Sequence, residues 1–486
     1  MAGTISQSSA SEEPVDLTSA PLCVDLDGTL CRTDTLIESC LRWVLKRPTN
    51  VFLILAALVK GRACLKERLA QENLPNIALL PYNHALIDWL RTEKSSGRKL
   101  VLATAANAAI AEEVARHVGC FDMVIASNAT RNLKGSAKVD ELNKRFSASG
   151  FDYVGDSTAD IPVWAQARRA YAVNPQKHVL RAVPKLATVN VKRLSLFRSL
   201  LRACRPHQWA KNILLFVPLI AAHRIFDFRT DLAVAVSFIA FCLVASSVYL
   251  TNDIVDLEND RAHPKKKHRP IANGDLPIGK ALGASIALLA GGLALSASVS
   301  PGFFLCLFAY YGITFAYSHY LKRKLIVDVI CLALLYSARV LAGGITAHIV
   351  LSHWLLAFSM FLFTSLAFVK RYTEINAMGK SMAGNSGRAY CPTDLLIIAM
   401  LGVSSGILST LILVLYVSSP EVQALYRSPQ LLLIACPILL YWFARLWILT
   451  GRNDVHHDPI VFALRDARSY VVALLLAAVL VFATVF

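Results

Sequence analysis

The chain has 486 residues, of which 55% are hydrophobic, and its formal net charge is +17. The positive charge does not indicate nucleic acid binding, because the cations lie beside apolar segments and fit phospholipid headgroups, phosphorylated substrates and membrane topology better. The eleven cysteines are scattered singly without a CxxC pair, so neither a zinc site nor a disulfide framework is indicated. Apolar residues are unevenly spread: about the first 200 residues are typical of a soluble region and the rest of a membrane region.

The soluble region begins with a polar tail, residues 1–20, without a visible signal peptide, so we expect this half to stay in the cytosol. Residues 21–30 then predict a buried strand that ends in two aspartates and a glycine turn. Further strands are predicted at 99–104, 123–127 and 151–156, and they alternate with helical stretches such as 108–118. This alternation predicts a parallel α/β sheet, whose ligands gather at the carboxyl ends of its strands.

A helical insert is predicted between the first two strands, over residues 36–71. It contains the apolar run 51–59, which is too short to span a bilayer. The run fits either a buried cap helix or a patch resting on the membrane, and both interpretations stay open.

Four motifs follow the predicted strands in order: DxDGT from Asp25 to Thr29, a strand-end Thr104, a lysine within residues 133–138, and GDxxxD from Gly155 to Asp160. Over about residues 21–180, this set resembles the haloacid dehalogenase (HAD) phosphohydrolases. The resemblance implies a HAD-like (Rossmannoid) α/β domain.

The same resemblance implies roles for individual residues. Asp25 would be the nucleophile that forms an aspartyl-phosphate, and Asp27 the general acid and base. Thr104 and Lys138, or alternatively Lys134, would hold the phosphoryl group. The implied ligands of Mg²⁺ are Asp25, Asp27, Asp156 and Asp160.

A linker over residues 181–207 leads to the membrane region. Within it, residues 194–204 place apolar residues at helical spacing beside basic ones, which predicts an interfacial helix. The next stretch, 205–212, puts Trp209 and Lys211 at the expected headgroup level.

From residue 208 onward we expect an all-α domain of about nine spans. The predicted spans are 212–223, 232–251, 280–299, 302–318, 325–345, 352–369, 395–418, 430–449 and 469–486. Loops on one side hold most of the cations, which predicts an integral protein of a bacterial-type inner (plasma) membrane with its HAD domain in the cytoplasm. In one such loop, residues 456–459 (HHDP) favour a turn and a helix start over a metal site.

An aspartate motif, NDxxDxxxD, ends the second predicted span and precedes the basic loop 261–270. Asp253, Asp256 and Asp260 are three and four residues apart, so at helical pitch they lie on one face and repel one another unless a cation joins them. Magnesium binds carboxylates together with substrate phosphates, so the motif predicts a magnesium-diphosphate site rather than an ordinary solvated helix end.

Together with RPxQWxKN at 205–212, residues 263–274, 317–322 and 370–374, the motif resembles the UbiA-type intramembrane prenyltransferase superfamily over about residues 200–486. Within it, the resemblance is to the decaprenyl-phosphate phosphoribosyltransferase branch. Aromatic prenyltransferases of the superfamily carry a second aspartate-rich motif, whereas this chain offers only Asp328 there. The resemblance implies phosphoribosyl diphosphate as the donor and a polyprenyl (decaprenyl) phosphate as the acceptor.

It also implies that Asp253, Asp256 and Asp260 hold Mg²⁺ with help from Asn252. The candidates for substrate contacts are Arg205, Lys211, Lys265, Arg269, Tyr317, Lys322, Arg339, Lys370 and Arg371. Any one of these cations could instead snorkel or set topology, although Arg339 lies inside a predicted span.

The fusion predicts a bifunctional enzyme. The phosphatase would remove the 5-phosphate from the transferase product and give polyprenyl-phosphoryl ribose for lipid-linked pentose (arabinose) donors. The alternatives are an aromatic prenyltransferase that uses a polyprenyl diphosphate, and a transporter or scaffold with a phosphate-sensing domain. The sequence predicts neither prenyl chain length nor oligomeric state.

Overall fold

The computed structural model describes residues 20–486 apart from 129–130, 176, 184, 190, 192, 225–226, 379–388 and 456–457. The predicted polar tail up to residue 19 and the pair His456 and His457 therefore lie outside the described residues. The chain divides into two compact units, one of Met1–Ala203 with Leu250–Gly283 and the other of Cys204–Tyr249 with Ala284–Phe486.

The first unit contains a six-stranded sheet in the order β3-β2-β1-β4-β5-β6, with every pair parallel. Its strands are β1 (Leu22–Val24), β2 (Leu100–Asn107), β3 (Met123–Ser127), β4 (Asp152–Gly155), β5 (Ala170–Val173) and β6 (Ala187–Val189). The central strand β1 is apolar and fully buried, as expected for a strand covered on both faces. The predicted parallel α/β fold is confirmed, and its last two strands extend the sheet beyond the predicted ones.

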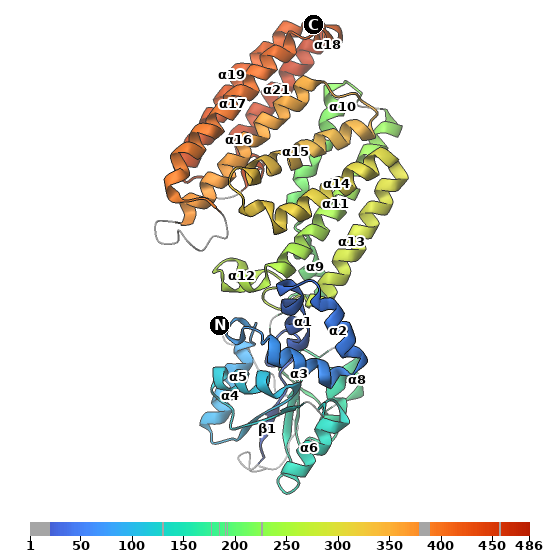
Figure 1. Ribbon diagram of the computed structural model, residues 1–486, viewed down its shortest axis with the longest axis vertical. Coiled ribbons are helices and arrows are strands. Elements are labelled where there is room, and N and C mark those ends of the chain that lie inside the picture. The colour runs from blue at the N-terminus through green and yellow to red at the C-terminus, as the bar shows by residue number, and fades with distance from the viewer. Residues whose placement is uncertain are drawn as a thin grey trace. The chain divides into compact units, whose positions relative to one another are not determined.

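Helices cover both faces of this sheet (Figure 1). One hydrophobic cluster joins β1 and β2 to α4 (His84–Ser95) and α5 (Ala108–Val118). A second cluster joins alternate residues of the same strands to α6 (Ser136–Phe146), α7 (Ile161–Trp164) and α8 (Lys177–Ala182). The short 3₁₀ helices η1 (Ile77–Leu79) and η2 (Thr158–Asp160) lie in the connections. Apolar residues that alternate along the strands thus pack against apolar faces of the helices, and the sheet is buried between two helical layers.

The insert forms three helices: α1 (Thr35–Lys46), α2 (Asn50–Val59) and α3 (Arg62–Glu72). Asp34 caps α1 by accepting from the backbone N–H groups of the first turn. Only one side of α2 packs inward, through Ile54 and Ala57, whereas Phe52 is 70% exposed and Val59 is 89% exposed. The interpretation of this run as a fully buried cap helix is therefore wrong, because the outer apolar face of α2 is exposed.

The helix α9 (Leu196–Cys204) lies at the first boundary between the units. A helix was predicted here, and its location at the membrane interface stays a prediction. The first unit also includes α12 (Leu257–Ala262) and η4 (Lys266–His268), which lie in the aspartate motif and the basic loop.

Among the described residues, eight helical segments are long and apolar enough to cross a membrane. They are Phe228–Val255, Ile278–Val299, Pro301–His319, Val327–Thr346, His353–Ala377, Pro392–Val417, Pro429–Gly451 and Ala467–Val485. The prediction of nine such spans is wrong at the first, because residues 212–223 fall in a 3₁₀ helix, η3 (Pro206–Phe216), and a short α10 (Val217–Ala221). Pro218 and the poorer hydrogen bonding of a 3₁₀ helix limit a continuous α-helix here.

The helices of the membrane region are α11 (Phe228–Val255), α13 (Ile278–Val299), α14 (Pro301–His319), α15 (Val327–Thr346), α16 (His353–Met378), α17 (Leu395–Val417), α18 (Pro420–Leu425), α19 (Ala435–Gly451), α20 (Pro459–Ala463) and α21 (Ala467–Val485), with η5 (Leu321–Arg323), η6 (Pro392–Asp394) and η7 (Pro429–Ile434) between them. In the second unit α15 is central, since its two sides belong to two hydrophobic clusters, one with α16 and α19 and one with α11 and α14. Figure 1 shows α16, α17, α19 and α21 running side by side. The helical fold with its candidate spans agrees with the predicted UbiA-like domain.

Candidate active sites

The HAD motifs meet at the carboxyl edge of the sheet. Asp25 directly follows β1, Thr104 lies in β2 and Asp156 directly follows β4. The chain turns at Gly28, whose φ is +81°, and a Cβ there would lie 2.2 Å from a carboxylate oxygen of Asp156. A residue with a side chain does not fit, so this glycine lets the first motif approach the fourth.

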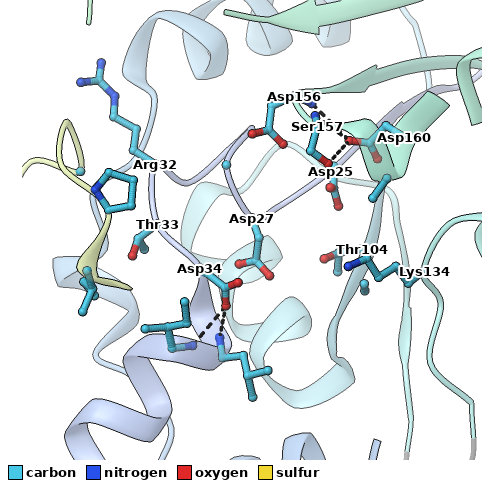
Figure 2. A pocket seen from close by; sticks show the side chains of 18 of the residues that line it. Asp25, Asp27, Arg32, Thr33, Asp34, Thr104, Lys134, Asp156, Ser157 and Asp160 are labelled. Carbon is cyan, nitrogen blue, oxygen red and sulfur yellow. Dashed lines mark hydrogen bonds between the residues drawn. The ribbon is translucent and has the colours of Figure 1, made fainter. Parts of the chain in front are cut away.

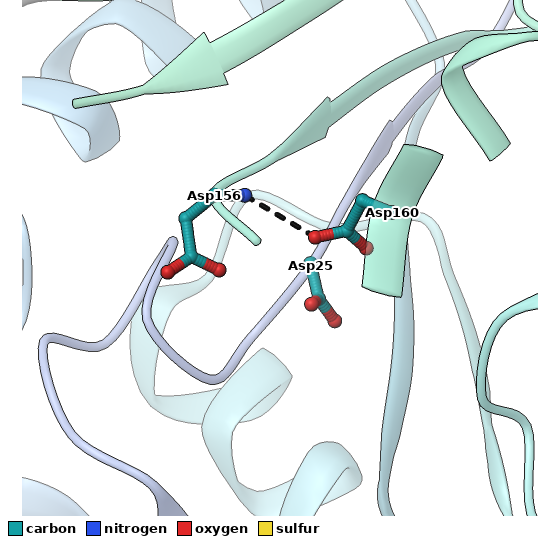
Figure 3. A group of neighbouring side chains, drawn as sticks. All are labelled: Asp25, Asp156 and Asp160. Atoms are coloured by element: carbon teal, nitrogen blue, oxygen red, sulfur yellow. Dashed lines mark hydrogen bonds between the residues drawn. The ribbon is translucent and has the colours of Figure 1, made fainter. Parts of the chain in front are cut away.

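Three carboxylates form a cluster at this edge. Asp25, Asp156 and Asp160 each offer an oxygen, and these oxygens lie within 4.8 Å of one another (Figure 3). Burial raises the pKa of Asp25 to about 6, even though the ammonium group of Lys138 opposes the shift. Burial and the two neighbouring carboxylates raise the pKa of Asp156 to about 7. Crowded, buried carboxylate oxygens are relieved by a hard divalent cation, so this donor set fits Mg²⁺.

Lys138 contacts the nucleophile directly. Its buried ammonium group donates to Oδ1 of Asp25 at 3.1 Å and to the Tyr153 hydroxyl at 2.6 Å. Lys134 lines the same pocket, but its side chain is exposed. Of the two lysines that the sequence left open, the structure therefore brings Lys138 to Asp25.

The remaining two predicted metal ligands differ in surroundings. Asp160 accepts hydrogen bonds from Ser157 and from the Tyr153 hydroxyl, so its carboxylate also fixes the loop after β4. Asp27 instead accepts from the backbone N–H of Thr35 at 2.9 Å, outside the three-carboxylate cluster. Burial and the charge of Asp34 raise the pKa of Asp27 to about 8. A carboxyl group that stays protonated near neutral pH suits proton donation.

The aspartate motif lies in the first unit at a break between two helices. α11 ends at Val255 and α12 begins at Leu257, so Asp256 interrupts the single helical face that spacing predicted. Asp253 and Asp260 are nevertheless brought together, because Nη1 of Arg269 donates to Asp253 at 3.0 Å and to Asp260 at 2.6 Å. The predicted cation between these carboxylates is here a guanidinium group.

Both bridged carboxylates are 2% exposed, whereas Asn252 and Asp256 are half-buried and Lys265 is exposed. Burial raises the pKa of Asp260, against the opposing charge of Arg269. Within the described chain, the motif's carboxylate oxygens do not gather as those around Asp25 do. The oxygen donors suit Mg²⁺, but the place between Asp253 and Asp260 is filled by Arg269.

The second unit holds a separate cluster of cations around one carboxylate. Lys211 of η3 pairs with Asp458, the N-cap of α20, and Nζ of Lys370 in α16 lies 3.6 Å from the same oxygen. The Tyr336 hydroxyl donates to that oxygen at 3.4 Å. Two ammonium groups thus share a single carboxylate, an excess of positive charge that favours a bound anion.

Arg339 lies beside this cluster on α15. Its guanidinium group donates to the side chain of Asn212 at 2.9 Å and to the Tyr310 hydroxyl at 2.8 Å, and it is stacked 5.5 Å from the Tyr336 ring centroid. Arg339 is buried, and none of these partners carries a negative charge that would compensate its guanidinium group. The sequence-predicted residues Lys211, Arg339 and Lys370 are therefore brought together.

Other predicted cations are placed elsewhere. Arg371 is fully buried, and its Nε lies 3.0 Å from Asp328, which also accepts from the Tyr390 hydroxyl at 2.5 Å. Arg371 therefore joins α16 to α15 rather than facing a pocket. Arg205 lies 5.0 Å from the ring centroid of Tyr249, whereas Tyr317 and Lys322 are half-buried.

Sequence reasoning missed three members of the second cluster: Asp458, Tyr336 and Asn212. Asp458 precedes a proline, and that pattern predicted only a helix start, which the structure contains. Tyr336 stands three residues before Arg339, so helical spacing could have placed both on one face of the span. Asn212 is the last residue of the RPxQWxKN motif, but no role was predicted for it.

Two family models match the chain. One, described as the UbiA prenyltransferase family, matches residues 213–465, and the other, described as haloacid dehalogenase-like hydrolase, matches residues 22–164. The first matched region contains Asp458, Arg339 and Lys370 but begins just after Lys211, and the second contains the carboxylates around Asp25.

Three relatives illustrate the similarity. The uncharacterized protein y4nM of Sinorhizobium fredii is 35% identical over 469 residues, which cover 95% of this chain and 91% of that protein. The nodulation protein NoeC of Azorhizobium caulinodans is 32% identical over 290 residues, or 59% of this chain and 93% of that protein. The decaprenyl-phosphate phosphoribosyltransferase of Corynebacterium glutamicum is 38% identical over 216 residues, or 43% of this chain and 65% of that protein.

Proposed function

Because the chain belongs to the UbiA prenyltransferase family and carries an N-terminal haloacid dehalogenase-like hydrolase domain, we propose that it makes and then dephosphorylates a phosphoribosyl lipid. The donor would be phosphoribosyl diphosphate and the acceptor a polyprenyl phosphate. The similarity to a decaprenyl-phosphate phosphoribosyltransferase supports these substrates.

The cation cluster of the second unit is the observation that carries the transferase proposal. Lys211, Lys370 and Arg339 provide three positive charges against the one carboxylate of Asp458. Donor and acceptor are both phosphate anions, and their approach requires such compensation. An aromatic acceptor would bring less negative charge than a lipid phosphate, so it would require less compensation by these cations.

The state of Asp328 also favours a phosphoribosyl donor over an isoprenoid diphosphate. Asp328 is the one acidic residue available for a second aspartate-rich motif, yet it is fully buried against Arg371 and Tyr390. Because Arg371 is itself fully buried, unlike the half-buried Arg269 beside Asp253 and Asp260, it has no room to release Asp328, whose oxygens are therefore not offered to a second metal.

In the transfer step, an oxygen of the lipid phosphate would form a bond to ribose C1 while the bond from C1 to the diphosphate breaks. The acceptor is already an anion, so no base is needed. Mg²⁺, when bound by Asp253, Asp256 and Asp260, would neutralise the diphosphate as it leaves. Arg269 would have to release Asp253 and Asp260, and its guanidinium group would then bind the diphosphate instead.

In the second step, Asp25 would attack the 5-phosphoryl group while Asp27 protonates the departing ribose oxygen. Water would then attack the aspartyl-phosphate and give up a proton to Asp27, which releases inorganic phosphate and restores both carboxyl groups. The net reaction consumes one water and gives polyprenyl-phosphoryl ribose. Lys138 would stabilise charge on the transferring oxygens, and Mg²⁺ at Asp25 and Asp156 would share that role.

We further propose that the hydrolase domain lies in the cytoplasm and that the membrane is a bacterial-type plasma membrane. The eight candidate spans place the segments 256–277, 320–326, 378–391 and 452–466 on a single side if each span crosses once. These segments are rich in lysine and arginine, as expected of cytoplasmic loops. Because residues 250–283 form one compact unit with the sheet, the hydrolase domain would lie on the same side as these loops, and the chain between residues 204 and 228 would then have to cross the membrane as well.

Purified protein in detergent tests both steps at once. It would be incubated with Mg²⁺, polyprenyl phosphate and phosphoribosyl diphosphate labelled in the ribose, and the lipids separated by chromatography. We expect wild type to form a ribosyl lipid and Asp25→Asn to accumulate its 5-phosphate.

Absence of label from the lipid fraction would exclude the phosphoribosyl reaction, and transfer of a polyprenyl diphosphate to an aromatic acid would then identify an aromatic prenyltransferase. If neither Asp25→Asn nor Asp253→Asn changed any turnover, a transporter or scaffold would be the better explanation.

A further inference from the structure

The pocket around the phosphatase residues extends well beyond the carboxylates that would react. Its volume is about 540 Å³, and the segment after the basic loop helps to line it through Gly274, Asp275, Pro277, Ile278 and Lys280. These residues belong to the same compact unit as the sheet. At Gly274 φ is +79°, and a Cβ there would lie 2.9 Å from the carbonyl oxygen of Arg32. The pocket therefore has an outer wall to which the membrane half of the sequence contributes.

Cations line this outer part of the pocket: Arg32, Arg193 and Lys280. Nη2 of Arg193 donates to the carbonyl oxygen of Gly28 at 3.2 Å, and Nη1 of Arg32 lies 3.7 Å from Asp275. The Nε atoms of both arginines are buried without a hydrogen-bond partner among the described residues. Buried donors of this kind need an acceptor, and an anionic ligand would supply one.

One of these cations, Arg32, is separate from the groups that would hold the phosphoryl group. In Figure 2, Arg32 lies on one side of Asp27, whereas Thr104 and Lys134 lie on the other. A single phosphoryl group on Asp25 cannot contact both sides of a pocket of this volume. The pocket thus has room for a second anionic group of the same substrate.

Apolar side chains surround the outer cations. Ile37, Leu194 and Leu196 line the pocket and are 40%, 38% and 45% exposed. Ile278, which also lines it, is the first residue of a candidate membrane span. Such surroundings suit an anion that is attached to a hydrocarbon chain.

We propose that Arg32, Arg193 and Lys280 form a second anion subsite, which binds the internal phosphodiester of a lipid-linked pentose 5-phosphate while Asp25 attacks its terminal phosphoryl group. The proposal rests on the function proposed above and narrows the substrate class of the phosphatase. The substrate of this site therefore carries two anionic groups on one pentose ring. Its polyprenyl chain extends out of the pocket along the apolar side chains. The pentose phosphodiester thus selects the substrate, and the phosphomonoester reacts.

Three substrates separate the contributions. Ribose 5-phosphate has only the reacting group, ribose 1,5-bisphosphate adds a second anion, and the phosphoribosyl lipid adds both the anion and the chain. Full-length protein with Mg²⁺ would be assayed for phosphate release as wild type, Lys280→Gln, Arg193→Gln and Arg193→Lys. Lys144→Gln, an exposed lysine of α6 outside the pocket, is the matched control.

We expect Lys280→Gln to lower kcat/KM for the bisphosphate and the lipid about tenfold more than for ribose 5-phosphate, mainly through KM. Arg193→Gln should show a larger difference, and Arg193→Lys should recover part of it because it keeps the charge. Lys144→Gln should match wild type on all three substrates.

An equal loss on all three substrates would overturn the subsite, because the side chains would then support only the catalytic groups. If wild type hydrolysed ribose 5-phosphate but neither the bisphosphate nor the lipid, the proposed function itself would fail. Wild-type turnover of the lipid with an unchanged substrate ratio in Lys280→Gln and Arg193→Gln would reject the subsite and leave the proposed function standing.

Discussion

Replacing Asp458 with asparagine removes the carboxylate that pairs with both the buried Lys211 and the half-buried Lys370. The side chain of Asp458 is 10% exposed. Burial alone would raise its pKa, but the two ammonium groups lower the pKa of Asp458 from 3.8 to about 2. At about 1.4 kcal/mol per pKa unit, the ionised carboxylate contributes about 2 kcal/mol to the stability of the native state. Since the folded pKa is the lower one, this contribution is complete above about pH 4 and is lost as the pH falls toward 2.

Asp458→Asn should therefore destabilise the protein at pH 7. The lost carboxylate accounts for about 2 kcal/mol, and the two ammonium groups left without it bring the cost nearer the roughly 3–5 kcal/mol of a broken buried pair. For a domain of this size the apparent Tm should fall by roughly 5–15 °C. Thermal unfolding in detergent, followed by size-exclusion chromatography of the soluble fraction, measures the shift.

Added diphosphate should raise the Tm of Asp458→Asn more than that of wild type, because it replaces the missing negative charge. Asp454→Asn, an exposed aspartate in the same loop, is the control and should melt with wild type. A Tm for Asp458→Asn within about 2 °C of wild type would refute the reasoning, since the cations would then be compensated without Asp458. So would a diphosphate effect of equal size in the two proteins.

The hydrolase domain gives three further predictions. Lys138→Met should lower kcat for phosphate release by roughly 100-fold or more, because it removes a buried donor beside Asp25. Lys134→Met, at an exposed lysine, should lower kcat less than about tenfold. Turnover of p-nitrophenyl phosphate measures both effects. The pH profile of kcat/KM should rise as Asp25 ionises around pH 6 and fall above about pH 8 as Asp27 loses its proton, and a profile that stays flat from pH 6 to 9 would contradict these roles. In vesicles with a photoactivatable phospholipid, peptides from α2 should be labelled more strongly than those from α5, and Phe52→Asp should reduce that labelling.

The sheet could be predicted from the sequence because its central strands are continuous apolar runs followed by glycine and aspartate. β3 and α5 coincide with their predicted ranges, 123–127 and 108–118. The last two strands, β5 and β6, are only four and three residues long, and runs of that length resemble many other apolar stretches.

Site residues could be predicted where a motif places them at the ends of parallel strands. They could not be predicted where two side chains meet only through the packing of helices that are distant in sequence. Asp25 and Asp156 could be placed together because parallel strands end at one edge. Asp458 could not be placed beside Lys211, because 247 residues separate them and only helix packing brings them together. The count of spans failed at residues 212–223, since hydropathy does not distinguish a 3₁₀ segment from an α-helix.

The aspartate motif shows what a charge pattern can and cannot predict. Its spacing indicated that carboxylates meet and need a cation, but spacing alone does not choose between a metal and a side chain. In the structure Arg269 bridges Asp253 and Asp260, so this place already holds a positive charge before any substrate arrives. A guanidinium group can bridge two carboxylates through its several donors, and the same donors match the oxygens of a phosphate. Arg269 could therefore exchange its carboxylates for the diphosphate as Mg²⁺ binds, so that the motif is electrostatically compensated both before and after the donor arrives.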